Sequence, residues 1–254
     1  MNVQEVSKVL MTKKYISEKN NALPDWFKKE YAHFDKIVSD ANFPCHFGTV
    51  AHQNGNLLFT YVENHDFSLL PNKLTKFLKI SIDNPENKHV LVVFIEPEET
   101  EKTFEYYHEY FWNILDFLHK SDEMEWPKEW PRNPDDPKWE FIYNKEPIFV
   151  SANGPFYKKR VTRNLGNSLI LIFQPRRIFH DIAHDSPAGK KAIHIIRKKV
   201  EEIEQMPIHP DLGGYGDINK REWKQYLITD DNESTTLECP FKAKYFTEKS
   251  NRDS

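Results

Sequence analysis

The sequence predicts a single α+β domain in which helices pack on a mixed β-sheet. Short, continuous apolar runs such as 90–95 and 168–173 are typical of strands that are buried on both faces. Longer segments in which large apolar residues recur every three or four positions are typical of amphipathic helices. The two kinds of segment are interspersed without regular strand–helix–strand alternation, and this favours the α+β class over a doubly wound fold.

The predicted elements follow one another without an internal repeat. Strands are predicted at 57–63, 90–95, 139–143, 147–152 and 168–173. Helices are predicted at 24–40, 73–82, 101–119 and 187–205. The two strands on either side of Asn144-Lys145-Glu146 are close enough in sequence to form a hairpin.

The helices at 24–40 and 101–119 have the clearest periodicity. In the first, the apolar positions are Phe27, Tyr31, Phe34 and Val38. In the second, they are Phe104, Tyr107, Phe111, Ile114, Leu115 and Leu118. Pro24-Asp25 suits the first turn of the first helix, and His119-Lys120 suits the last turn of the second. Each helix is therefore expected to bury one broad stripe against the sheet.

The segment 121–138 interrupts this pattern. It contains Trp126, Trp130 and four prolines, which make a regular helix or strand unfavourable. An interdomain linker is one interpretation, but a linker would leave both indoles in water. We therefore predict a loop that packs on one domain spanning 1–254, with a core at about 24–242 and a polar tail at 243–254.

Composition excludes several classes of protein. A net charge of −4 over 254 residues gives no general electrostatic basis for binding nucleic acid or an anionic membrane. No apolar run approaches the roughly 18 residues of a transmembrane helix, and the N-terminus does not resemble a secretory signal. The only cysteines, Cys45 and Cys239, are too few for a disulfide scaffold. We expect a cytoplasmic protein with free thiols.

One candidate site surrounds Cys45. Cys45 and His46 are adjacent, and His52 follows within the same short segment. Thiolate and imidazole are ligands that transition metals prefer, but this spacing matches no zinc motif. The alternative is a structural cysteine that packs near a turn as a small apolar side chain.

A second candidate is the basic stretch 154–178, which contains no acidic residue. Its bases are Lys158, Lys159, Arg160, Arg163, Arg176 and Arg177. Arginines on either side of the predicted strand 168–173 are suited to binding one carboxylate, phosphate or cofactor propionate. We expect Arg160, Arg163 and Arg176 to line a common anion site. The alternative is a solvated, charged surface.

A third candidate is the segment from His209 to Tyr226. Gly213, Gly214 and Gly216 lie within four positions, which is typical of a turn or of backbone that approaches a ligand closely. His209 precedes the glycines and is a candidate metal ligand or acid–base group. We expect 209–217 and 222–226 to wall a ligand pocket opposite the basic stretch. The alternative is a rigid turn with its aromatic side chains in the core.

Taken in order, these segments resemble the YqcI/YcgG family of bacterial proteins from about Phe43 to Phe241. The residues that carry the resemblance are Phe43-Pro44-Cys45, Trp139-Glu140-Phe141, Phe149-Val150, Arg160, Arg163-Asn164, Phe173-Gln174-Pro175-Arg176, His209-Pro210, Leu212-Gly213, Tyr215-Gly216, Glu222-Trp223-Lys224-Gln225-Tyr226 and Cys239-Pro240-Phe241. No one of these motifs is specific, but their order and joint occurrence are. A related branch consists of heme-dependent N-hydroxylases of guanidine or amine groups.

The resemblance implies a heme monooxygenase, with one departure from the pattern. The related enzymes carry a His-Pro pair before the paired arginines, whereas this chain has Gly154-Pro155. Glycine cannot bind iron, so another residue must do so if heme is bound. The candidate axial ligands are His209, Tyr157 and Cys45, in that order. Arg160, Arg163 and Arg176 are the candidate partners of the propionates, and Tyr215, Trp223 and Tyr226 are expected at the edges of the heme.

Two functions follow from the sequence. The first is heme-dependent N-hydroxylation of a small substrate with a guanidine or amine group, which also requires an electron donor. The second is non-catalytic binding of heme or of a small anion. Both need a small-molecule pocket, and neither involves nucleic acid or a membrane.

Overall fold

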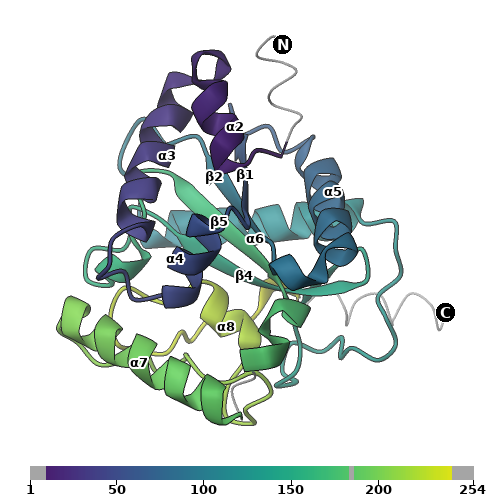
Figure 1. Ribbon diagram of the computed structural model, residues 1–254. Helices are drawn as coiled ribbons and strands as arrows, with labels where there is room; N and C mark the ends of the chain where they lie inside the picture. The colour runs from purple at the N-terminus through teal and green to yellow at the C-terminus, as the bar shows by residue number, and fades with distance from the viewer. Residues whose placement is uncertain (1–9, 183–185, 242–254) are drawn as a thin grey trace.

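Five strands form one open, mixed sheet in the computed structural model of the chain, which describes residues 10–182 and 186–241 (Figure 1). The strands are β1 (Leu57–Val62), β2 (Val90–Ile95), β3 (Phe141–Tyr143), β4 (Glu146–Asn153) and β5 (Leu169–Pro175). Their order across the sheet is β1-β2-β5-β4-β3. The predicted mixed sheet and α+β class are confirmed, and each predicted strand is found within a few residues of its expected place.

Strands β1 and β2 are the parallel pair of the sheet, whereas the other neighbours run antiparallel. Leu57 pairs with Val90 and Val62 with Ile95, so the two strands end at the same edge. The helix between them, α5 (Leu70–Asp83), makes the crossover that a parallel pair requires. The loops that follow β1 and β2 therefore start side by side.

The helices of the described part of the chain are of two kinds. The long amphipathic ones are α3 (Asp25–Val38), α5, α6 (Phe104–Ser121) and α7 (Pro187–Glu204), and all four were predicted. The short ones are α2 (Lys13–Glu18), α4 (His46–Gln53) and α8 (Glu222–Tyr226). Four 3₁₀ turns are η1 (Asn20–Ala22), η2 (Pro85–Asn87), η3 (Val161–Arg163) and η4 (Arg176–Ile182). The short elements span too few residues to show helical periodicity in the sequence.

The sheet is buried on both faces, which explains why every residue of β1 and β2 is buried and nearly all of them are apolar. Leu58 and Val62 of β1 belong to the core on the side of α5 and α6. Phe59 and Tyr61 belong to the core on the side of α3. Figure 1 shows the sheet between these groups of helices, with α7 lying beside α8 at the end of the molecule farthest from α2.

The predicted hairpin and the proline-rich loop both pack as expected. Asn144 and Lys145 adopt left-handed φ values of 50° and 64°, as a two-residue turn between antiparallel strands requires. In the loop, Trp126 is 8% exposed and its indole N–H donates to the carbonyl of Trp130 at 3.1 Å. Trp126 also stacks on Trp139 with ring centroids 6.3 Å apart. Trp126 therefore anchors the segment 121–138 to the folded core.

Within 10–182 and 186–241, none of the helices combines the length and the apolar character that crossing a bilayer requires. The polar tail predicted at 243–254 lies outside the described residues.

Candidate functional site

The basic stretch at 154–178 binds carboxylates, and these carboxylates belong to the chain itself. The backbone N–H groups of residues 158–160 donate to the Asp230 carboxylate at 2.9 to 3.1 Å, so this loop is an anion-binding concavity that is already filled. The Arg160 side chain is 1% exposed and donates to the Glu204 carboxylate at 2.9 Å. Both acids, Glu204 and Asp230, follow β5 in the sequence.

Arg176 lies between two buried carboxylates. Its Nε donates to the two oxygens of Glu140 at 3.0 and 2.9 Å, and its Nη2 donates to Glu222 Oε1 at 2.5 Å. Glu140 is fully buried, and Glu222 is 4% exposed. The ring of Tyr215 lies over the guanidinium with its centroid 4.1 Å from Cζ. The group thus holds one positive and two negative charges when both acids are ionised.

This arrangement raises the pKa of Glu140 to about 7. Burial is the largest cause, because it disfavours the carboxylate form. Arg176 opposes the shift, and the negative charge of Glu222 adds to it. Glu140 is therefore a buried carboxyl that exchanges its proton near neutral pH.

The arginine contacts give no support to a common anion site. Arg163 donates from Nη1 and Nη2 to the Gln225 carbonyl at 3.4 and 3.3 Å. In the described residues, Arg160, Arg163 and Arg176 have no partner in common, and two of them already bind protein carboxylates. An external anion at Arg160 or Arg176 would have to displace an internal acid.

His209 is a structural residue in this arrangement. Its Nδ1 accepts from the backbone N–H of Asp211 at 3.1 Å, and its Nε2 lies 2.8 Å from Thr229 Oγ1. The pKa of His209 is lowered to about 4, mainly by burial; the positive charges of Arg160 and Arg163 contribute to this lowering and Asp211 opposes it, so the ring is neutral at pH 7. Because both nitrogens have partners inside the protein, the geometry does not favour His209 as a metal ligand.

The other two candidate ligands are also engaged. Tyr157 is fully buried and donates its hydroxyl to the Ile228 carbonyl at 2.9 Å, and burial raises its pKa to about 12. A tyrosine ligand binds iron as the phenolate, which this environment disfavours. Cys45 caps the N-terminus of α4, where its sulfur accepts from the Gly48 N–H at 3.4 Å. Burial raises the pKa of the Cys45 thiol, which disfavours the thiolate.

The place at which related hydroxylases carry a His-Pro pair is closed by an aromatic ring. A Cβ atom added at Gly154 would lie 2.9 Å from Cε1 of Phe156 and 3.3 Å from the Ser168 carbonyl oxygen. A histidine there would have to displace the Phe156 ring, which packs 4.8 Å from that of Tyr107. Together with the engaged ligands and paired arginines, this means that heme does not fit the predicted residues as the structure arranges them.

Of the predicted aromatic residues of the third segment, Tyr226 lies in the core, Trp223 lies beside a polar cavity and Tyr215 lies over the Arg176 guanidinium. Tyr226 is fully buried, accepts from the Phe141 N–H at 2.9 Å and donates to the Ile148 carbonyl at 3.2 Å. Trp223 lines a polar cavity of about 660 Å³. The cavity is lined by Asp135, Pro210, Asp211, Ile218, Asn219, Lys220, Arg221, Trp223, Lys224, Ser234, Leu237, Glu238 and Cys239. Parts of 209–217 and 222–226 thus wall a cavity, but the basic stretch contributes none of its lining.

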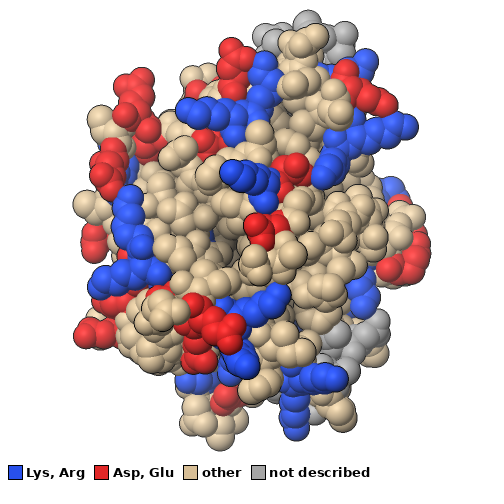
Figure 2. Space-filling model, turned by 60° about the vertical axis from the view of Figure 1, so that its left-hand side comes forward, with Lys and Arg blue, Asp and Glu red and all other residues tan. Residues whose placement is uncertain are grey.

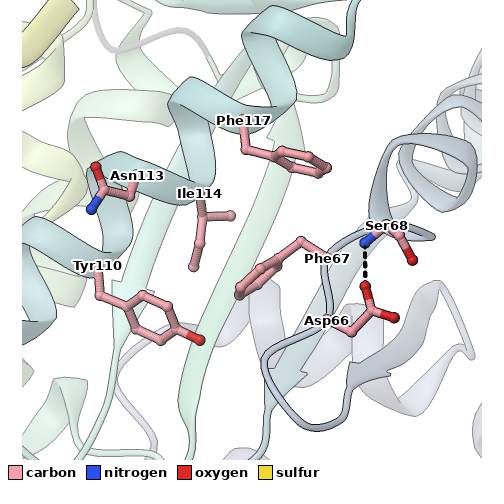
Figure 3. A pocket seen from close by; sticks show the side chains of 7 residues that line it. All are labelled: Asp66, Phe67, Ser68, Tyr110, Asn113, Ile114 and Phe117. Carbon is pink, nitrogen blue, oxygen red and sulfur yellow. Dashed lines mark hydrogen bonds between the residues drawn. The ribbon is translucent and has the colours of Figure 1, made fainter.

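A second cavity, of about 320 Å³, was not predicted from the sequence (Figure 3). It lies between α6 and the loop that follows β1, at the edge where the parallel strands end. Its lining consists of Asp66, Phe67, Ser68, Tyr110, Asn113, Ile114 and Phe117. Figure 3 shows the rings of Phe67 and Tyr110 directed into the space between loop and helix. Crevices outside the carboxyl ends of parallel strands are common ligand sites.

A cluster of polar side chains adjoins this cavity. Tyr110 Oη lies 2.5 Å from His65 Nδ1, and His65 Nε2 lies 3.7 Å from Glu98 Oε1. Tyr106 also donates to Glu98 Oε1, at 2.5 Å. Sequence patterns contain little sign of this cluster, because its members come from the loop after β1, the loop after β2 and helix α6. The one available signal was the short acidic and polar run after each predicted strand.

Charge on the face drawn in Figure 2 is mixed. Figure 2 shows basic and acidic side chains interspersed around a largely uncharged area of one face, without a broad region of one sign. Within the described residues, no group of three or more His, Cys, Asp or Glu side chains is arranged to hold a metal ion.

Comparison with known proteins places the chain in a family. No solved structure matches it. It is 33% identical over 240 residues to "Uncharacterized protein YcgG" and to "Uncharacterized protein YqcI" of Bacillus subtilis (strain 168), covering 91% of this chain and 94% of each relative. It is 28% identical over 226 residues to "Putative N(omega)-hydroxy-L-arginine synthase DcsA" of Streptomyces lavendulae, covering 86% of this chain and 85% of the relative. The model of the YqcI/YcgG family matches residues 34–242, and the chain therefore belongs to the YqcI/YcgG family.

Proposed function

We propose that this protein binds a small molecule through a cationic amine or guanidine group in the cavity between α6 and the loop after β1, and that this nitrogen undergoes N-oxygenation. The observation that carries the proposal is the composition of the cavity. Three aromatic rings and one carboxylate line it, and no lysine or arginine does. Such a lining is suited to a cation and not to an anion.

The charge at the cavity supports a cationic ligand. Hydrogen bonds from the backbone N–H and hydroxyl of Ser68 lower the pKa of Asp66 below its usual value, so Asp66 is ionised at neutral pH. The faces of Phe67, Tyr110 and Phe117 supply the negative side of the aromatic quadrupole. A planar guanidinium can stack on such a ring while it donates hydrogen bonds to a carboxylate.

The reaction is inferred from a relative. DcsA is named for hydroxylation of an arginine guanidine nitrogen, which is the kind of group that the cavity suits. The described side chains supply binding and orientation, and the redox chemistry requires a further group or partner. The alternative of a small-anion binding protein has lost its support, because Arg160 and Arg176 already bind Glu204, Glu140 and Glu222.

Calorimetry with a matched pair of ligands tests the binding step. L-Arginine and agmatine should bind, whereas L-citrulline, which replaces the guanidinium by a neutral urea, should bind at least about tenfold more weakly. Asp66→Asn should weaken arginine binding by about tenfold, since it removes the negative charge that pairs with the guanidinium and one acceptor of its hydrogen bonds. Glu99→Gln, which removes an exposed carboxylate outside the cavity lining, is the control. Equal binding of arginine and citrulline would contradict the proposal.

A second experiment tests the oxygenation. The protein is incubated with the bound ligand, oxygen, a reductant and hemin, and mass spectrometry is used to find a product that is heavier by one oxygen atom. Absorption spectra of the same samples show whether hemin is taken up. Uptake of hemin would mean that residues other than the predicted ligands hold heme, and that heme can be the further group that the redox chemistry requires. A protein that binds arginine but neither takes up hemin nor forms the product would overturn N-oxygenation and leave ligand binding intact.

A further inference from the structure

Three polar side chains are linked at the cavity between α6 and the loop after β1. Tyr110 lines the cavity, and its hydroxyl points toward the loop that carries Asp66 and Phe67 (Figure 3). Its oxygen is 2.5 Å from His65 Nδ1. On the other side of the imidazole, Nε2 is 3.7 Å from the carboxylate of Glu98. The hydroxyl, the imidazole and the carboxylate thus follow one another outward from the cavity lining, with the His65 side chain 42% exposed.

The backbone places His65 in this position at a conformational cost. Asn64 and His65 both have left-handed φ values, 51° and 54°. Such a pair is uncommon outside glycine, and it is found where the surrounding structure holds it in place. Here the Asn64 N–H donates to Glu96 Oε2 at 2.7 Å, which ties the loop after β1 to the loop after β2. The turn therefore fixes the imidazole between Tyr110 and Glu98.

The protonation states of the linked groups follow from their surroundings. Burial, with contributions from Tyr106 and Glu98, raises the pKa of Tyr110 above its usual range, so its hydroxyl keeps its proton. The hydroxyl then donates to Nδ1 of a neutral imidazole, and the remaining proton lies on Nε2, toward Glu98. Tyr106 donates to the same carboxylate oxygen at 2.5 Å and holds it in place.

We propose that Tyr110, His65 and Glu98 form a proton relay that removes a proton from the cationic nitrogen bound in the cavity. This inference rests on the proposed binding function. The substrate N–H bond breaks and its proton passes to Tyr110 Oη, while the Tyr110 proton passes to His65 Nδ1. No group is oxidised or reduced. The positive charge moves from the substrate to the imidazolium, where Glu98 stabilises it, and the nitrogen regains the lone pair that oxygenation requires.

Exchange of guanidinium protons with water gives a direct readout of the relay. NMR saturation transfer measures the exchange rate of agmatine N–H protons with and without a small amount of the protein, while calorimetry measures binding. We expect wild type to accelerate exchange by at least about 100-fold, the range of general base catalysis. Tyr110→Phe and His65→Gln should each abolish this acceleration and change the agmatine dissociation constant by no more than about threefold.

The control is Tyr215→Phe, which removes a tyrosine hydroxyl that donates to the Lys138 carbonyl and does not line this cavity. It should keep the acceleration, and melting temperatures show whether each variant is folded. Binding without faster exchange in wild type would overturn the relay and leave the binding proposal standing. Acceleration that survives both Tyr110→Phe and His65→Gln would also overturn it, as would its loss in Tyr215→Phe to the same extent. A wild type that binds no agmatine would overturn both proposals.

Discussion

Replacing Glu140 by glutamine should change how the stability of the protein depends on pH. The pKa of Glu140 is raised from 4.5 to about 7, so the folded state holds a proton that the unfolded chain has released. A carboxyl of this kind contributes stability that is fully present below the unfolded pKa of 4.5 and is lost as pH rises through about 7. The E140Q variant cannot ionise and lacks this dependence.

The size of the effect follows from the shift. A difference of about 2.5 units between folded and unfolded pKa corresponds to about 3 kcal/mol of unfolding free energy. Relative to wild type, E140Q should therefore gain about 3 kcal/mol between about pH 4.5 and about pH 8. Any loss from the altered contact between residue 140 and Arg176 is common to both ends of this range.

Urea unfolding of both proteins across this pH range is the measurement. Glu99→Gln is the control, because it removes an exposed glutamate. The comparison of variant with wild type is essential, since His209 acts in the opposite direction over part of the same range. A difference in unfolding free energy between wild type and E140Q that stays constant with pH would refute the raised pKa of Glu140.

The remaining predictions concern residues that the structure assigns to folding. Wild type should lose about 3 kcal/mol of unfolding free energy as pH falls from 6.5 to about 4, because the pKa of the buried His209 ring is lowered to about 4. His209→Gln should not show this loss. Urea unfolding as a function of pH checks this, and equal pH profiles for variant and wild type would contradict it. Gly166→Ala should cost about 1 to 3 kcal/mol, since φ is +142° and the new Cβ would lie 2.6 Å from Glu30 Oε2. Gly55→Ala, with φ +74° but nothing within 4 Å, isolates the backbone part of that cost. Asp230→Ala should destabilise by about 1 to 3 kcal/mol through the unpaired N–H groups of residues 158–160, and a melting temperature equal to that of wild type would argue against the concavity.

The sequence predicted the long elements because each of them carries its own signal. The stripe of Phe27, Tyr31 and Phe34 in α3 is visible without knowing what covers it. Helix α8 has no such stripe over its five residues, although Trp223 and Tyr226 are both buried. Helix α8 is stabilised by its packing on the sheet, and this packing cannot be predicted from the local sequence.

The basic stretch shows why the site was harder to predict than the fold. It contains no acid over 154–178, and this favoured an external anion. The acids arrive from both directions along the chain: Glu140 from before β4, and Glu204 and Asp230 from beyond β5. Pairings at separations of 36 to 72 residues depend on the tertiary fold alone. The same holds for His65 and Tyr110, which are 45 residues apart.

The internal pairing of the basic stretch also has a consequence for synthesis on the ribosome. When residue 175 has emerged, every strand of the sheet is present, but Arg160 still lacks Glu204 and residues 158–160 still lack Asp230. A buried guanidinium without its counter-ion is strongly unfavourable, so the loop cannot close over Arg160 until the chain beyond residue 232 has appeared. The nascent protein should therefore keep this end of the sheet open until late in translation. Protease-sensitive intermediates should accumulate on stalled chains that end between η4 and α8.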